Sequence, residues 1–125
     1  MPKTAAEMVA EAKARVPAVT PEEASQMENV VFVDLREASE IAASGKVAGA
    51  VAIPRGLLEF KADPSHAMHE AAMDPSKTVV TYCASGGRAA LAAAMLQDLG
   101  YENVRHMGGF KDWADKGLPV DKGES

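Results

Sequence analysis

The chain contains a single cysteine, Cys83, in 125 residues. One cysteine excludes an intrachain disulfide, so the sequence does not predict the cross-linked scaffold of a small secreted protein. We therefore expect a cytoplasmic protein. No stretch approaches the roughly 20 apolar residues that a membrane-spanning helix needs. The first residues include Glu7 and Glu11 and hold no apolar core of a signal peptide. We therefore expect no contact with a membrane.

Positive charge is also scarce. The chain has 13 Lys and Arg against 18 Asp and Glu, and its cations do not cluster, which argues against a nucleic-acid partner. His66 and His69 lie three residues apart, but no third ligand is near them, so we expect no metal and no cofactor. The apolar share of 47% is that of an ordinary globular domain.

The informative stretch runs from Thr78 to Leu99. A β-branched run ends at Cys83, and an alanine-rich segment with apolar residues at helical spacing follows it. This pattern predicts a buried strand, a tight loop and a buried helix. After the cysteine, the loop consists of Ala84, Ser85, Gly86, Gly87 and Arg88.

A cysteine at that place is suited to carry a negative charge. The first turn of a helix has unpaired N–H donors and a partial positive charge, and such a site can lower a thiol pKa from about 8.5 to between about 3.5 and 7.5. Gly86 and Gly87 would let several N–H groups converge on the sulfur, and Arg88 adds a permanent cation. The sequence thus predicts a nucleophilic thiolate at Cys83. A buried, inert cysteine is the alternative.

Helices and strands alternate along the rest of the chain. Capping boxes predict helices after Thr4 and after Thr20. We therefore expect an α/β fold with a central, mostly parallel sheet of about five strands and helices on both faces. We divide the chain into an N-terminal helical extension, residues 1–19, and a domain, residues 20–121. The strands expected beside the central one span 30–33, 47–53 and 104–107.

Two of these strands end in polar residues. Asp34 and Arg36 follow the first strand, and Cys83 ends the central one. Ligand sites of parallel sheets lie at the carboxyl ends of the strands, so we expect these residues at one edge of the molecule.

The ordered motifs resemble those of the rhodanese-like sulfurtransferases, from about Thr20 to Val120. The resemblance implies a rhodanese-like fold and an enzyme that moves a sulfane sulfur from a donor to a nucleophilic acceptor through a persulfide of Cys83. The donor would be thiosulfate or another small sulfur-donor anion, and the acceptor cyanide, a thiol or a protein. The motifs are Pro21-Glu22-Glu23, Asp34-x-Arg36-Glu37, Gly49-Ala50, Cys83-x-x-Gly86-x-Arg88 and Gly108-Gly109-Phe110-x-x-Trp113.

The same resemblance implies roles for the charged residues. The loop from Ala84 to Arg88 would bind the anion, with Arg88 either facing the donor or holding the loop to neighbouring carboxylates. Arg55 could bind an anionic donor, or it could pair with Glu59 four residues later. We expect Asp34 and Arg36 to form a structural ion pair near the site.

Two other classes of function remain open. Cysteine phosphatases and arsenate reductases have five residues between cysteine and arginine, whereas four separate Cys83 from Arg88 here, which makes a smaller cradle. A non-catalytic sulfur carrier, or a redox sensor with an exposed thiolate, would use the same cysteine. Turnover with small donors separates an enzyme from a carrier.

Overall fold

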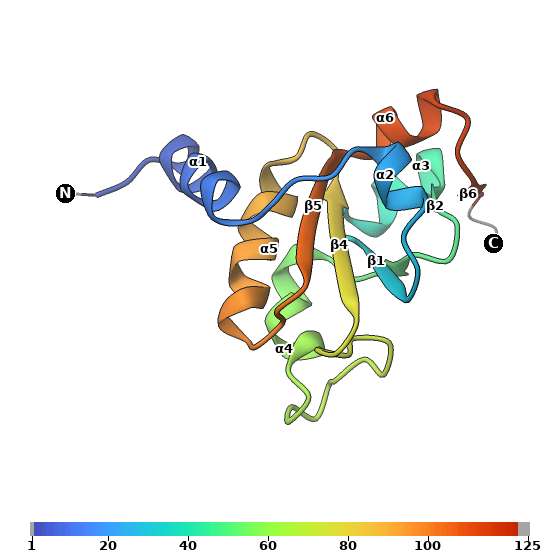
Figure 1. The fold of residues 1–125 in the computed structure, drawn as a ribbon. Helices are drawn as coiled ribbons and strands as arrows, with labels where there is room; N and C mark the ends of the chain where they lie inside the picture. The colour runs from blue at the N-terminus through green and yellow to red at the C-terminus, as the bar shows by residue number, and fades with distance from the viewer. Residues whose placement is uncertain (1, 123–125) are drawn as a thin grey trace.

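A computed structural model describes residues 2–122, and a four-stranded sheet lies at its centre (Figure 1). All neighbouring strands in this sheet are parallel, as the alternating pattern predicted. Their carboxyl ends therefore share one edge, where β1 ends at Asp34 and β4 at Cys83. The order across the sheet is β3 (Val51–Ala52), β1 (Val30–Asp34), β4 (Thr78–Cys83) and β5 (Val104–Gly109).

A second, smaller sheet pairs β2 (Lys46–Val47) with β6 (Val120–Asp121) in antiparallel register. The single strand predicted at 47–53 is therefore two strands in two sheets. Gly49 has φ +79°, a left-handed conformation that suits glycine, and the N–H of Ala50 donates to the carbonyl of Val47 at 2.9 Å. This turn ends β2 and sends β3 to the main sheet, which has four strands where about five were expected.

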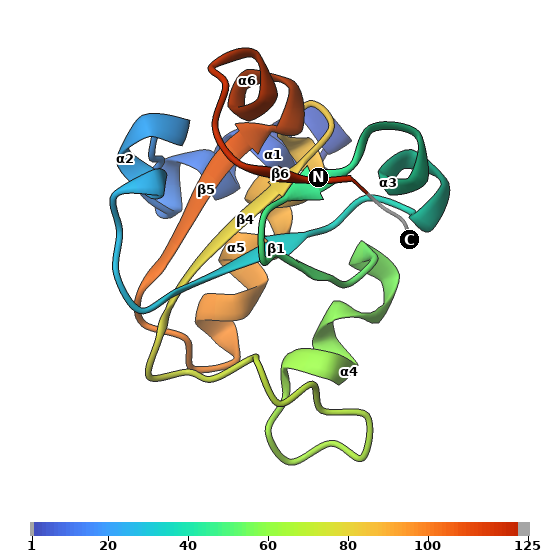
Figure 2. The ribbon, with the colours of Figure 1, turned by 90° about the vertical axis from the view of Figure 1, so that its right-hand side faces the viewer.

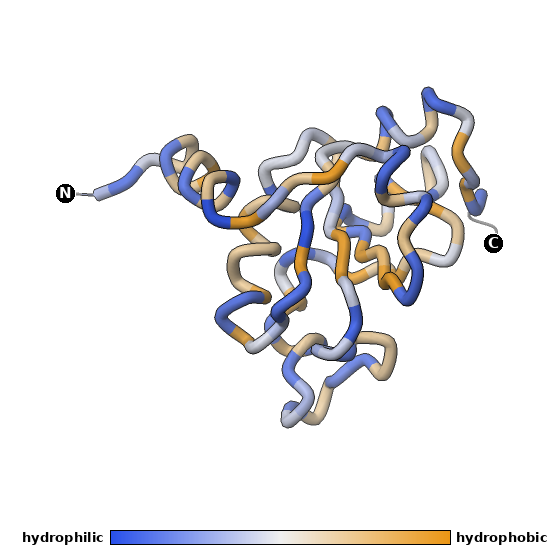
Figure 3. Tube along the Cα trace, in the orientation of Figure 1, coloured by the Kyte–Doolittle hydropathy of each residue, from blue (hydrophilic) through white to orange (hydrophobic). Residues whose placement is uncertain are grey.

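Helices cover both faces of the main sheet, as Figures 1 and 2 show from two directions. On one face a core cluster joins strand residues to α4 (Leu58–Ala62) and α5 (Gly87–Asp98), and α1 (Ala5–Arg15) packs against α5. On the other face a second cluster joins them to α2 (Pro21–Ser25) and α6 (Phe110–Asp115). Figure 3 shows hydrophobic segments along the strands between these layers. Burial of both sheet faces explains the continuous apolar runs of β1 and β4.

Two short helical segments lie in the connections that follow β1 and β3. The helix α3 (Ala38–Ser44) follows β1, and a 3₁₀ turn, η1 (Arg55–Leu57), leads into α4. Within residues 2–122, no helix combines the length and the apolar character needed to cross a bilayer.

Both predicted capping boxes are confirmed. The hydroxyl oxygen of Thr4 accepts the N–H of Glu7 at 3.0 Å, and that of Thr20 accepts the N–H of Glu23 at 3.0 Å. At the other end of α1, the guanidinium of Arg15 bonds to Gln97 and Asp98 of α5. The amino-terminal helix is thus fixed along the helix that follows the cysteine.

Candidate active site

Cys83 is the last residue of β4, and its side chain is 1% exposed. Its Sγ accepts a hydrogen bond from the backbone N–H of Gly86 at 3.0 Å. Gly86 has φ +106°, which residues with a side chain rarely adopt, so glycine is needed to turn this N–H toward the sulfur. The exposed thiolate expected of a redox sensor is therefore wrong for this conformation, because the chain wraps around the sulfur.

The amino terminus of α5 lies directly after this turn. The helix begins at Gly87, within the stretch that the sequence predicted as loop, and it has twelve residues. Within residues 2–122, the N–H groups of Gly87, Arg88 and Ala89 have no hydrogen-bond acceptor. Free donors at a helix start favour an anion. Thr81 ties the helix to β4, since its hydroxyl donates to the carbonyl of Ala89 at 2.8 Å.

The end of β5 lies under the cysteine loop. A Cβ at Gly109 would collide with the carbonyl oxygen of Ala84, so only glycine fits there. A Cβ at Gly86 would lie 3.5 Å from the Cα of Gly108. The pairing of β4 with β5 is irregular between Thr81 and Cys83, which lets the loop approach this glycine pair.

Arg88 forms a bidentate ion pair with Glu40 of α3. Its two terminal nitrogens lie 2.9 and 3.0 Å from the two carboxylate oxygens. Each side chain is 35% exposed. The hydrogen bonds from Arg88, with a smaller contribution from the N–H of Glu37, lower the pKa of Glu40 to about 2. The same bond raises the pKa of Arg88, and the neighbouring Cys83 adds to that shift.

Asp34 and Arg36 form the predicted ion pair, at 2.8 Å, and both are buried. The hydroxyl of Tyr82, the residue before the cysteine, donates to the same carboxylate at 2.6 Å and accepts the N–H of Val47 at 3.0 Å. Burial, then the charge of Asp34, raises the pKa of Tyr82, which keeps the hydroxyl protonated. Arg36 also donates to the carbonyl of Gly45 at 2.7 Å. The network joins β1, β4 and β2 beneath the site.

Arg55 pairs with Glu59 at 2.9 Å, the i to i+4 alternative that the sequence left open. Among the hydrogen bonds and ion pairs of the described residues, none joins Arg55 to the cysteine loop. His66 and His69 also stand apart from a metal-binding arrangement. In the described part of the chain, no three His, Cys, Asp or Glu side chains are grouped to hold a metal ion.

Sequence reasoning missed Glu40, Tyr82 and the need for glycine at position 109. A signal existed for Glu40, because an acidic residue in the first turn of a helix after β1 lies at the sheet edge where Cys83 was expected. Tyr82 gave no such signal, since an aromatic residue within a strand is equally typical of simple core packing.

Comparison with known proteins finds a family and several relatives. The model of the family called "Rhodanese-like domain" matches residues 20–116 of this chain. A protein of Allochromatium vinosum named "Sulfurtransferase" is 37% identical over 94 residues, which cover 74% of this chain and 79% of that protein.

Two solved structures are similar over most of the chain. A protein of Rhodopseudomonas palustris, called a possible tyrosine phosphatase of unknown function, is 37% identical, with a TM-score of 0.87 over 97% of this chain and 99% of that one. The polysulfide-sulfur transferase homodimer of Wolinella succinogenes is 30% identical, with a TM-score of 0.73 over 90% of this chain and 83% of that one.

Proposed function

The chain belongs to the rhodanese-like family, and we propose that it transfers sulfane sulfur through a persulfide on Cys83. The observation that carries the proposal is the position of Sγ, at 3.0 Å from the N–H of Gly86 and beside the unpaired N–H groups that begin α5. A thiolate and a persulfide are both anions that such donors stabilise.

In the loading step, the Cys83 thiolate attacks the outer sulfur of the donor. With thiosulfate, a bond forms between Sγ and that sulfur, the sulfur–sulfur bond of the donor breaks, and its electron pair leaves with sulfite. The enzyme is left with a persulfide anion, and no external oxidant is needed. An inorganic polysulfide donates its outer sulfur in the same way, and the leaving group is a polysulfide with one sulfur atom fewer.

In the discharge step, a nucleophile attacks the outer sulfur of the persulfide. With cyanide, a carbon–sulfur bond forms, the bond between the two sulfurs breaks, and its electron pair returns to Sγ. Thiocyanate leaves and the thiolate is restored. A thiol or a protein acceptor takes the sulfur by the same displacement. The loop donors hold the negative charge in each state, so the cycle requires no general base.

Phosphate-ester hydrolysis is the rival that the Rhodopseudomonas palustris relative suggests. Two features favour sulfur transfer instead. Four residues separate Cys83 from Arg88, which makes a smaller cradle than the five of the phosphatase loops. Asp34, a buried acid at the same edge of the sheet, is held by Arg36 and Tyr82 and is not free to protonate a leaving group.

Thiocyanate formation tests the proposal. We expect the native chain, supplied with thiosulfate or inorganic polysulfide and with cyanide, to form many thiocyanates per molecule, and Cys83→Ser to form none. If a single equivalent forms and turnover stops, the chain is a carrier that a partner must reload. If p-nitrophenyl phosphate is hydrolysed with no sulfur transfer from any donor, the proposal is wrong.

A further inference from the structure

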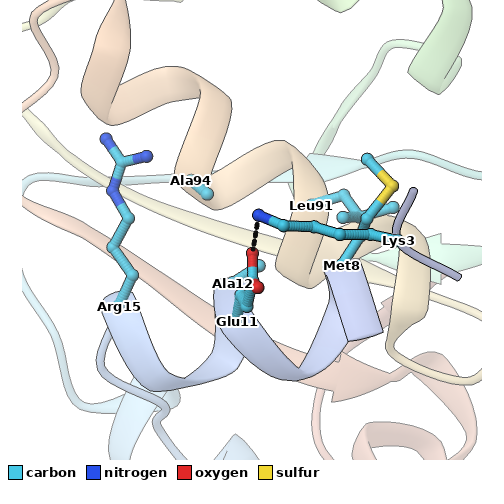
Figure 4. Close-up of a pocket in the computed structure, with 7 residues that line it drawn as sticks. All are labelled: Lys3, Met8, Glu11, Ala12, Arg15, Leu91 and Ala94. Atoms are coloured by element: carbon cyan, nitrogen blue, oxygen red, sulfur yellow. Dashed lines mark hydrogen bonds and ion pairs between the residues drawn. The ribbon is translucent and has the colours of Figure 1, made fainter. Parts of the chain in front are cut away.

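Two hollows flank α1, and the charges of the first are already satisfied. This hollow, of about 220 Å³, lies between α1 and α5 against Leu91 and Ala94. Figure 4 shows Lys3 reaching Glu11, and the two ends are 2.7 Å apart. Arg15 is bound to α5, as described above. No charged group on its lining is left to recognise a ligand.

The second hollow, of about 200 Å³, adjoins the cysteine loop. We call it the α1 hollow, because Lys13 of α1 forms part of its lining. The N–H of Gly86, a residue of the lining, donates to Sγ of Cys83, so the α1 hollow adjoins the loop that holds the sulfur. Its lining includes Lys13, Ala18, Val19, Gly86, His106 and Met107.

The wall that carries Lys13 is held firmly against β5. The N–H of Val19 donates to the carbonyl of His106 at 3.0 Å, and the N–H of His106 donates to that of Pro17 at 3.2 Å. The His106 ring nitrogen Nε2 lies 3.1 Å from the carbonyl of Val16. On α1 itself, Val9 lies 3.8 Å from the place of a Cβ on Gly87. The α1 hollow is therefore formed by fixed elements.

Lys13 is the one cation on the lining of the α1 hollow. Burial lowers the pKa of His106, so its imidazole is neutral at neutral pH, and Arg88 is not part of this lining. Within the described residues, Lys13 has no ion-pair partner and is exposed. Ala18, Val19 and Met107 add apolar side chains to the same lining. A short hydrocarbon chain that ends in an anionic group fits this lining better than a purely inorganic anion does.

We propose that the α1 hollow binds the carboxylate end of a small organic thiol that accepts sulfur from Cys83, with Lys13 as the specificity-determining residue. The inference rests on the proposed function and adds the class of acceptor. The acceptor thiolate attacks the outer persulfide sulfur, a new sulfur–sulfur bond forms, and the electron pair of the old bond returns to Sγ. Lys13 precedes residue 20, where the rhodanese-like match begins, so the contact is additional to the family domain.

Discharge of the loaded enzyme tests this inference. Cys83 is first persulfidated with inorganic polysulfide, excess donor is removed, and loss of the sulfur is followed by intact mass with mercaptopropionate, a carboxylate thiol, or mercaptoethanol, a neutral one. We expect Lys13→Gln to lower the ratio of the carboxylate-thiol rate to the neutral-thiol rate about threefold to fivefold, the size of an exposed charge contact. Lys13→Glu should lower it further.

The matched control is Lys77→Gln, which removes the same charge at the amino end of β4, far along the strand from Cys83, and from a side chain with no ion pair in the described part of the chain. Its ratio should equal that of the native chain. If Lys13→Gln leaves the ratio unchanged, or changes it no more than Lys77→Gln, the inference is wrong while the proposed function stands. If Cys83 cannot be loaded by any donor, the proposed function fails and the inference with it.

Discussion

Two arginine–carboxylate pairs lie at the carboxyl edge of the sheet, and they differ in exposure. The pair of Arg36 with Asp34 is buried, with side chains 5% and 0% exposed, and it is bonded further to Tyr82 of β4 and to the carbonyl of Gly45. The pair of Arg88 with Glu40 is 35% exposed on both sides and lies beside the cysteine. The chemistry of the two pairs is the same, but their surroundings are not.

The difference indicates what each pair is for. A buried charge without its partner is very costly, so the first pair cannot exchange partners and serves to fix the strand ends. A partly exposed pair is worth little to stability, because water and salt screen it. We therefore expect Arg88 to be able to turn from Glu40 toward a donor anion at small cost, in which case both of its predicted roles are compatible.

The largest effect should come from removing one partner of the buried pair of Asp34 with Arg36. We expect Asp34→Ala to lower the free energy of unfolding by about 3–5 kcal/mol, because Arg36 would remain buried without its carboxylate. Urea unfolding measures the change, and Asp34→Asn provides a milder variant if the alanine form does not fold. The control is Asp98→Ala, whose partner Arg15 is exposed, with a cost of about 1 kcal/mol or less. Equal losses for the two positions would contradict the contrast.

The next effect should appear in catalysis. Arg88→Ala removes a charge-assisted contact to an anionic donor, so we expect kcat/KM with thiosulfate to fall about tenfold to a hundredfold. A neutral trisulfide donor should lose much less, and Arg88→Lys should retain part of the rate. Equal losses with both donors would mean that Arg88 only holds the loop.

Removing the charge of Glu40 should have a smaller effect in the opposite direction. Glu40→Gln leaves Arg88 in place but no longer neutralises it, so we expect kcat/KM for thiosulfate to rise about twofold to fivefold. Steady-state thiocyanate formation measures this kcat/KM. The rate at which mercaptoethanol, a neutral thiol, discharges the loaded enzyme serves as the reference. A fall in the thiosulfate rate would show that Glu40 orients Arg88 for the reaction.

The smallest effect concerns acid stability. Glu40 has a folded-state pKa of about 2 against its usual 4.5. A lowered carboxyl pKa adds stability above the unfolded-state value, and this is lost as the pH falls toward the folded-state value. The native chain should thus exceed Glu40→Gln in stability above about pH 4.5, and the difference should shrink toward pH 2. Unfolding of both chains across the acid range checks this, and a difference independent of pH would refute it.

Local signals in the sequence predicted several features of the fold and part of the edge on which these pairs lie. The capping boxes at Thr4 and Thr20, the strand ending at Cys83 and the ion pair of Asp34 with Arg36 each depend on residues close together in the chain. The β-branched run and the glycine pair after the cysteine were sufficient to predict a strand, a turn and a helix, although the helix begins at Gly87 rather than after Arg88.

Contacts between distant residues were beyond such signals. Glu40 and Arg88 are 48 residues apart, as are Asp34 and Tyr82, and only the parallel pairing of β1 with β4 brings them together. The division of 47–53 into two strands follows from β6, a strand near the far end of the chain. The boundary of the extension at residue 19 stays a prediction, although α1 contacts α5 closely.

The central claim is that Cys83 carries the transferred sulfur, and intact-mass measurement tests it most directly. After exposure to thiosulfate or inorganic polysulfide and removal of the excess, the native chain should gain the mass of one sulfur atom, and cyanide should remove it. Cys83→Ala should gain nothing under the same treatment. A native chain that gains no sulfur from any donor, or a Cys83→Ala chain that gains and releases it equally well, would contradict the claim.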